Sequence, residues 1–533
     1  MFFSCFLDLI YLDLEFDFFF YLLFFQRRLT ADEGGPSLRQ GSACSLELRC
    51  THCGSIATEM SSVRSSTNHN SYDVNRRIVA SAVASGMGFT QTMNFFSLMG
   101  MPKPMSSRQW HNYKGTINTK AGEAVEEHLQ EAVKEVRRTY VDRGLGMPDD
   151  EGVMDIVVSV DGSWQKRGHK SHNGVVAVVE HHTGLIIDSV ALSNYCRHCN
   201  SAPKPDDPGF VAWQRNHQLH CQKNVDCASG AMEVEGALIL FSRSVDKHKL
   251  RYTQMLGDGD AKTHARIEAG DPYEGRPVLK LECVNHVAKR LGTGLRDLKA
   301  KLGAQGQSIG GRGKLTDDRI KQLTGYYGRA IKDNVGDLDG MVAAVWASYF
   351  HVTSTDDSHD HSLCPTGSDG WCFHQRATAD GVTPRPHSKS LPADVAAAIR
   401  PLYVRLSDRT LLTRCLHGWT QNDNECFHSG LWSLCSKTKW AGLATVEMCL
   451  ALAVQQFNKG ASTHLDLLRK VDITPSRALE EYCEKKDVKR MQHSSRNSTL
   501  KEKQRRQKID DAKRAEMEAC RRRDGVNYAG GGF

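Results

Sequence analysis

The sequence predicts a mixed α/β fold, in which a mixed sheet flanked by helices is interrupted by a mainly helical insertion and preceded by a helical domain. Three β-rich runs lie within residues 153–192, and a short His-Thr-Gly turn between the last two predicts a hairpin. Helical and extended patterns then alternate up to residue 302. A long stretch, 303–410, separates the last predicted strand from the final predicted helices.

The predicted elements follow from apolar periodicity taken along the chain. Residues 73–143 place apolar side chains at three- and four-residue steps, which predicts helices. The sheet is expected from strands at 153–161, 174–181, 185–192, 252–258 and 278–283, with helices at 232–245 and 284–302. The predicted regions are an irregular N-terminal region (1–72), a helical domain (73–150), the first part of the sheet domain (151–302), the insertion (303–410), the last part of the sheet domain (411–460) and a basic tail (461–533).

The insertion begins with a glycine-rich basic loop that leads into a helix with Thr316 as its expected N-cap. This loop is not a phosphate-binding P-loop, because Ser308 stands where that motif needs glycine and Leu315 follows Lys314. A helical pattern to about Tyr349, a Cys/His/Pro-rich segment at 351–392 and further helices at 392–415 and 424–459 complete the chain's ordered part.

Charge is concentrated at the C-terminus. The chain carries a net charge of +7, with 25% charged and 40% hydrophobic residues, as is ordinary for a soluble protein. Fifteen Lys or Arg and six Asp or Glu lie between Lys485 and Arg523, so this tail alone carries +9. Such a tail suits nucleic acid or a nuclear import receptor, and we expect the protein in the nucleus. The alternative is a solvated, partly helical tail.

Residues 2–25 are rich in Phe, Leu and Tyr and superficially resemble a membrane anchor. Four acidic residues interrupt this run, and each charge near a bilayer centre costs about 2–3 kcal/mol. No basic segment precedes the run and no small-residue cleavage site follows it. We therefore expect an extension outside the fold, either poorly ordered or an artefact of gene prediction, with a signal anchor as the alternative. We expect no membrane partner.

Three acidic residues stand where strands or helices begin or end. Asp161 closes one predicted strand, Asp258 closes another, and Glu425 begins an amphipathic helix. Converging carboxylates suit Mg²⁺ or Mn²⁺, and nucleases hold two such ions about 3.5–4 Å apart. Asp at a strand end is also a common turn residue. Asp260 lies in the same turn as Asp258 and is the alternative to it.

Four motifs occur in a distinctive order: SVDGSWQKRGHKSHNGVVAVVE, GDGDAKTH, ECVNHVAKRLGTGLR and NDNECFHSGLW. Together they resemble the Mutator-like transposase domain over roughly Tyr72 to Lys459, and the ending GVNYAGGGF resembles the usual terminus of that family. The resemblance implies a ribonuclease-H-like catalytic core with an insertion before the last acidic residue. It also implies the metal-binding roles of a DDE transposase for Asp161, Asp258 and Glu425.

The resemblance also places Cys283 and His286 near the active site. His286 would orient a phosphate or a metal-bound water, and Cys283 would be a buried packing thiol. The alternative is that both residues only pack at a helix N-terminus.

Several residues are candidates for DNA binding. Trp164, Lys166 and Arg167 follow Asp161, where cationic and aromatic groups meet a DNA backbone or a flipped base. The alternative is a core tryptophan followed by two solvated cations. The helical domain at 73–143, the basic tail and the glycine-rich loop, with Arg312 and Lys314, are further candidates.

Cysteines and histidines form three groups with metal-ligand spacing. The best spaced has the pattern Cys-x2-Cys…His-x3-Cys in a loop-rich stretch (196–227), where a tetrahedral Zn²⁺ would act as a staple and a redox Cys-x-x-Cys is the alternative. Its predicted ligands are Cys196, Cys199, His217 and Cys221, with His220 and Cys227 as spare candidates. A weaker zinc group consists of His361, Cys364 and Cys372, with His359 and His374 nearby, and the weakest consists of Cys44, Cys50 and Cys53. Free thiols and exposed histidines are the alternatives for the last two.

The expected function is metal-dependent cleavage and transfer of DNA strands at transposon ends. Water and then a 3′-hydroxyl would be the nucleophiles, without a covalent enzyme intermediate. The expected partners are double-stranded DNA, as terminal inverted repeats and as target, and further copies of the chain. Two alternatives stay open: a domesticated DNA-binding protein without catalytic activity, and a metal-dependent nuclease of repair or RNA processing.

Overall fold

The computed structural model describes residues 29–33, 39–40, 42–50, 56–60, 62–65, 71–166, 170–258, 261–387 and 390–502, with residues 504–506, 508–509 and 512 beyond them. The apolar stretch 2–25, Arg167, Asp260 and the ending GVNYAGGGF lie outside the described residues. The chain forms two compact units. One consists of Met1–Ala124 with Lys459–Phe533, and the other of Val125–Asn458.

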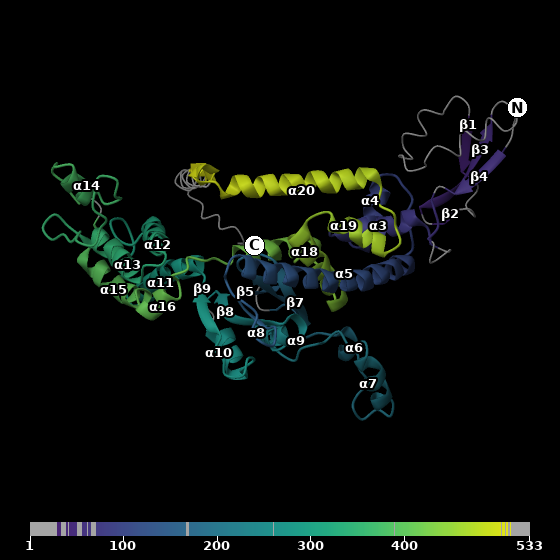
Figure 1. Ribbon diagram of the computed structural model, residues 1–533, viewed down its shortest axis with the longest axis horizontal. Coiled ribbons are helices and arrows are strands. Elements are labelled where there is room, and N and C mark those ends of the chain that lie inside the picture. The colour runs from purple at the N-terminus through teal and green to yellow at the C-terminus, as the bar shows by residue number, and fades with distance from the viewer. Residues whose placement is uncertain are drawn as a thin grey trace. The chain divides into compact units, whose positions relative to one another are not determined.

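The first unit contains a small antiparallel sheet (Figure 1). β1 (Leu29–Glu33), β2 (Arg39–Gln40) and β4 (Ile56–Met60) all pair with β3 (Ala43–Cys50). The prediction of an irregular region was wrong here, because apolar and polar residues alternate along 44–50, which is a strand pattern. Cys44 and Cys50 occupy the two ends of β3, about 20 Å apart at the rise of a strand, so they cannot share one zinc ion. Cys53 lies outside the described residues.

The predicted helices at 73–143 are present as α3 (Asp73–Ala84), α4 (Phe89–Leu98) and α5 (Ser107–Asp142). The C-terminal part adds α19 (Thr463–Lys470) and α20 (Arg477–Ser498). α19 packs against α3, and the Arg76 guanidinium on α3 donates hydrogen bonds to the carbonyls of Val471 and Asp472. Segments from both ends of the chain therefore build this unit together, whereas the part of α5 beyond Ala124 belongs to the second unit and packs in its core.

The second unit contains the mixed five-stranded sheet that the sequence predicts, in the order β7-β6-β5-β8-β9 (Figure 1). β5 (Met154–Trp164), β6 (Asn173–Glu180) and β7 (Ile186–Ser193) form an antiparallel meander. β8 (Leu250–Gly257) and β9 (Leu279–Glu282) continue the sheet in parallel with β5. β5 runs three residues beyond its predicted end, because Trp164 still pairs with Gly174, so Asp161 lies within the strand.

Helices cover both faces of this sheet. Alternate residues of β5, among them Val158 and Val160, share a core with α8 (Met232–Ser242). Gly236 allows this close packing, since a Cβ there would collide with Val176 of β6. On the opposite face of β5, Asp161 and Ser163 lie against α17 (Asn422–Leu434). α9 (Ser244–His248), α10 (Ala261–Gly270) and α18 (Leu443–Lys459) complete the surroundings of the sheet.

A helical region between β9 and α17 has a hydrophobic core of its own. It consists of α11 (Val284–Ala304), α12 (Asp317–Lys332), α13 (Leu338–Thr353), α14 (Phe373–Ala379), α15 (Ala393–Leu406) and α16 (Arg409–Thr413). α11 contributes buried residues to this core although the sequence grouped it with the sheet. Thr316 caps α12 as predicted, since its side chain accepts a hydrogen bond from the Arg319 amide.

The region's entry and exit lie side by side. The Glu282 amide donates to the Arg414 carbonyl at 2.9 Å, and the Val284 amide donates to the Trp419 carbonyl at 3.0 Å. These two backbone hydrogen bonds join the ends of the helical region next to the sheet.

Candidate functional site

Asp161 lies on the face of β5 that α17 covers. Its side chain is 22% exposed, and its Oδ2 is 3.4 Å from Nδ1 of His428 on α17, which is 8% exposed. The neighbouring β5 residue on this face, Ser163, accepts a hydrogen bond from the Trp432 indole at 2.8 Å. Asp161 is therefore accessible to solvent on one side and held by a buried histidine on the other.

Asp258 directly follows the strand that pairs with β5. β5 and β8 are parallel, and the last pair of their register is Ser159 with Leu256. β8 ends at Gly257 and exposed Asp258 is the next residue, so Asp258 lies at the same end of the sheet as Asp161. The Arg290 guanidinium on α11 donates to the Asp258 carbonyl at 3.4 Å and pairs with Glu282 at 2.6 Å, so the turn after β8 is tied to α11.

Glu425 lies in the first turn of α17 and is 56% exposed. Its Oε1 is 3.4 Å from Nε2 of His286, in the first turn of α11. Cys283, the buried N-cap of α11, donates its amide to the carbonyl of Gly257, which directly precedes Asp258. The Cys-x-x-His pair therefore connects the neighbourhood of Asp258 with Glu425.

The Cys283 thiol has a packing role, which both interpretations of the sequence expect, so the two differ only over His286. It is 1% exposed, and its Sγ accepts a hydrogen bond from the Gln421 amide at 3.4 Å. His286, in contrast, is 27% exposed and directed at a carboxylate. Only the histidine of this pair therefore reaches the acidic residues.

The N-cap Gln421 and three residues of α17 face β5 at spacings of three and four, and the sequence predicted no role for them. Gln421 Nε2 donates to the Val160 carbonyl at 3.0 Å, and Asn424 Nδ2 donates to the Ser159 carbonyl at 3.4 Å. His428 and Trp432 make the contacts given above, one and two turns further on. The signal was in the sequence: the inward positions of NDNECFHSGLW are polar where a core helix would be apolar.

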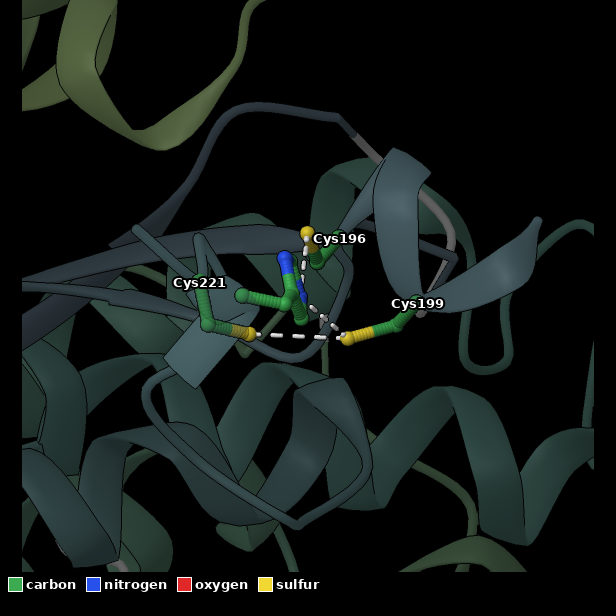
Figure 2. A group of neighbouring side chains, drawn as sticks. Cys196, Cys199 and Cys221 are labelled. Atoms are coloured by element: carbon green, nitrogen blue, oxygen red, sulfur yellow. Dashed lines mark hydrogen bonds between the residues drawn. The ribbon is translucent and has the colours of Figure 1, made fainter. Parts of the chain in front are cut away.

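The first Cys/His group comes together as predicted (Figure 2). The ligand atoms of Cys196, Cys199, His217 and Cys221 all lie within 4.8 Å of one another. His217 Nε2 is 3.0 Å from the Cys199 sulfur and 3.6 Å from the Cys196 sulfur. These ligands lie on or next to α6 (Arg197–Asn200) and α7 (Phe210–Gln218), and neither helix has a buried residue. A bound metal ion would therefore stabilise this segment in place of an apolar core. The spare candidates His220 and Cys227 are not in the group.

The family profile of the Mutator-like transposases matches residues 25–372, well over half of the chain. The chain belongs to the Mutator-like transposase family. The match covers the sheet and most of the helical region but ends before α17. In this member of the Mutator-like transposase family, α17 is held by its contacts with β5, and Glu425 by its contact with His286. A search of curated proteins finds no match.

The predicted DNA-binding residues that the structure describes have different surroundings. Trp164 packs against the core on the α8 side of β5, and its indole donates to the Ser229 carbonyl at 2.7 Å. This supports the packing interpretation of Trp164. Lys166 and Arg312 are exposed, and Lys314 is paired with Asp394 on α15 at 3.1 Å.

The second Cys/His group is also assembled, with a composition that the sequence did not predict in full. His361, Cys364 and Cys372 lie together, and their fourth neighbour is His351 of α13. Neither His359 nor His374 belongs to the group.

Across the described residues, no helix has the length and apolar character needed to cross a membrane.

Proposed function

We propose that this Mutator-like transposase cleaves DNA at transposon ends and joins it to target DNA, with Asp161, Asp258 and Glu425 as ligands of Mg²⁺ or Mn²⁺. The observation that carries the proposal is that α17 brings His428 against Asp161 on β5, while Glu425 of the same helix pairs with His286 of α11. Asp258 follows β8, the strand next to β5. Among the described residues, the three carboxylates are not one of the groups whose ligand atoms all lie within 4.8 Å of one another, so the proposal requires bound cations to draw them together.

The architecture supports a ribonuclease-H-like core. A three-stranded antiparallel meander is extended by two parallel strands, and helices cover both faces. The last proposed acidic residue arrives on a helix only after a long helical region, as the resemblance implies. We infer that this helical region is the insertion domain of the family.

The residues around Asp161 suit a hydrated cation. Carboxylate oxygens are the ligands that hard divalent ions prefer. Ser159 Oγ, Asn424 Oδ1 and His428 Nε2 are buried beside the acidic residue and have no hydrogen-bond partner among the described residues. Buried polar atoms of this kind are normally satisfied, and ordered water in the shell of a cation would satisfy them.

The chain's own groups would orient the reaction. Bound cations would polarise the phosphodiester and activate the attacking hydroxyl. His428 would hold the Asp161 carboxylate in one orientation, and His286 would do the same for Glu425. Arg290 would fix the backbone of the turn that carries Asp258. The exposed side of each carboxylate is left for the metal and the DNA.

Two further parts of the proposal follow from the family. The substrate would be double-stranded DNA carrying terminal inverted repeats, bound by more than one copy of the chain in the nucleus. Lys166 and Arg312 are exposed cationic groups available for the DNA backbone, and the positive charge of the basic tail would add to them. A domesticated DNA-binding protein is the second candidate, because the exposed positions of Asp258 and Glu425 are compatible with folding alone.

The deciding experiment is strand cleavage and strand transfer on DNA carrying the element's terminal inverted repeats, with Mg²⁺ or Mn²⁺. Asp161→Asn and Glu425→Gln should reduce both steps to background, because each removes one anionic ligand while keeping the side chain's shape. Asp423→Asn is the matched control, since this exposed acidic residue lies two positions before Glu425 on the same helix and makes no contact with His286. Equal activity of wild type and Asp161→Asn would overturn the proposal.

A further inference from the structure

The segment between α13 and α15 lacks an apolar core of its own. It runs from Ser354 to Pro392 and contains only the short helix α14. Among its described residues, Cys364 and Cys372 are the sole hydrophobic residues that are fully buried before Leu391. A segment of this length ordinarily needs a disulfide or a metal to hold it in one conformation.

Both cysteines are buried beside two histidines. His361 Nδ1 is 3.5 Å from the Cys372 sulfur and 3.7 Å from the Cys364 sulfur. His351, in the last turn of α13, places its Nδ1 3.9 Å from the Cys364 sulfur. The four ligand atoms all lie within 4.8 Å of one another, while His361 is 4% and Cys372 0% exposed.

We propose that His351, His361, Cys364 and Cys372 bind a structural zinc ion that fixes the 354–392 segment to α13. Two thiolates and two imidazoles in a closed, buried arrangement are a preferred donor set for tetrahedral Zn²⁺, which would be bound with release of the two thiol protons. Three ligands come from the segment and one from α13, so the ion would hold the segment against the helix in place of an apolar core. The proposal is independent of any DNA cleavage by the acidic residues.

The surroundings of His361 support metal binding over simple packing. Its Nδ1 faces both sulfurs, and its Nε2 is 2.9 Å from Nε2 of His387. His387 in turn places its Nδ1 2.8 Å from a carboxylate oxygen of Asp356, which also accepts the His387 amide at 2.8 Å. A ligating histidine commonly donates its second N–H to such a partner, which fixes its tautomer and orientation. Here His361 would donate its Nε2–H to His387, and His387 would donate its Nδ1–H to the Asp356 carboxylate.

Zinc content tests the proposal directly. Purified full-length wild type, Cys364→Ser/Cys372→Ser and His359→Ala are compared by elemental analysis after dialysis against metal-free buffer. The double variant should lose one zinc per chain relative to wild type. His359→Ala is the matched control, because its exposed imidazole is near His361 but outside the ligand group, and it should lose none. His387→Ala should keep the ion but bind it about 10–100-fold more weakly. Equal zinc content in wild type and the double variant would overturn the proposal.

A second measurement uses wild type alone, so that it does not depend on the folding of a variant. Thiols are alkylated with and without a zinc chelator and identified by mass spectrometry. Cys364 and Cys372 should react only after chelation, whereas Cys415, buried in the adjacent helical core, should stay unreactive in both conditions. The proposal fails if both cysteines behave like Cys415, or if they are recovered as a disulfide.

Discussion

His428 provides the sharpest test of how the acidic residues are organised. Its Nδ1 lies 3.4 Å from the Asp161 carboxylate, and His428→Ala would leave that carboxylate without its partner on α17. Loss of the partner that orients a metal-binding carboxylate costs about 10–100-fold in metal affinity. Because 3.4 Å is longer than a usual N–H···O hydrogen bond, we expect the lower end of this range, roughly tenfold weaker binding of a cation by Asp161. This corresponds to about 1.4 kcal/mol.

The assay is titration of zinc-replete protein with Mn²⁺, followed by electron paramagnetic resonance, which needs no DNA substrate. His428→Asn is the matched variant, because an asparagine amide nitrogen can take the place of Nδ1. We expect a roughly tenfold loss of Mn²⁺ affinity for His428→Ala and recovery of most of it for His428→Asn. The reasoning is refuted if His428→Ala binds Mn²⁺ like wild type. If both variants lose affinity equally, His428 acts through packing and does not orient the carboxylate.

Two further predictions concern the stability of the sheet. Burial by itself would raise the pKa of Asp188, but its contacts with His248 and Arg243 hold that pKa well below its ordinary value. The ionised Asp188 carboxylate therefore stabilises the fold fully above its unfolded-state pKa, and this stabilisation is lost only in strong acid. At pH 7, Asp188→Asn should lower the free energy of unfolding by about 3 kcal/mol, measured by urea denaturation. An unchanged denaturation midpoint would contradict this. Burial, with smaller contributions from neighbouring histidines, lowers the pKa of His181 to about 4 where its ring stacks on Trp419. Because the unfolded chain takes up this proton near pH 6.5 and the folded chain does so only near pH 4, stability should fall as the pH drops between these values. His181→Phe should weaken this dependence in denaturation midpoints at pH 7.5 and pH 5, and an identical dependence in both proteins would refute the assignment.

The sheet could be predicted from the sequence because its strands are continuous apolar runs with clear turns between them. The hairpin of β6 and β7, the start of α8 and the N-cap at Thr316 all follow from such local signals. The end of β5 was missed because Gly162 is a turn signal in isolation, whereas pairing with β6 carries the strand on to Trp164. The strands at 29–60 were missed because they are short and their alternating pattern is weakly apolar.

The candidate site could be predicted only in part, because its contacts join distant segments. The first zinc group was recognisable from spacing alone, since its four ligands lie within 26 consecutive residues. His351 escaped notice because it belongs to a helix that precedes the other ligands and has no ligand spacing of its own. His428 was missed for a related reason: its role depends on which strand α17 faces, and local sequence does not state this.

The backbone hydrogen bonds from Glu282 to Arg414 and from Val284 to Trp419 have an evolutionary consequence. They close a loop of more than 130 residues at its base, so the sheet and α17 are joined as if the chain between them were short. Lengthening a loop whose ends are already fixed costs little, because the closure entropy grows only with the logarithm of its length. The helical region could therefore change in length during evolution while the spacing between the strands and α17 stays constant. The same base would allow an experimenter to shorten the chain beyond α11, which has to stay because it carries His286 and Arg290.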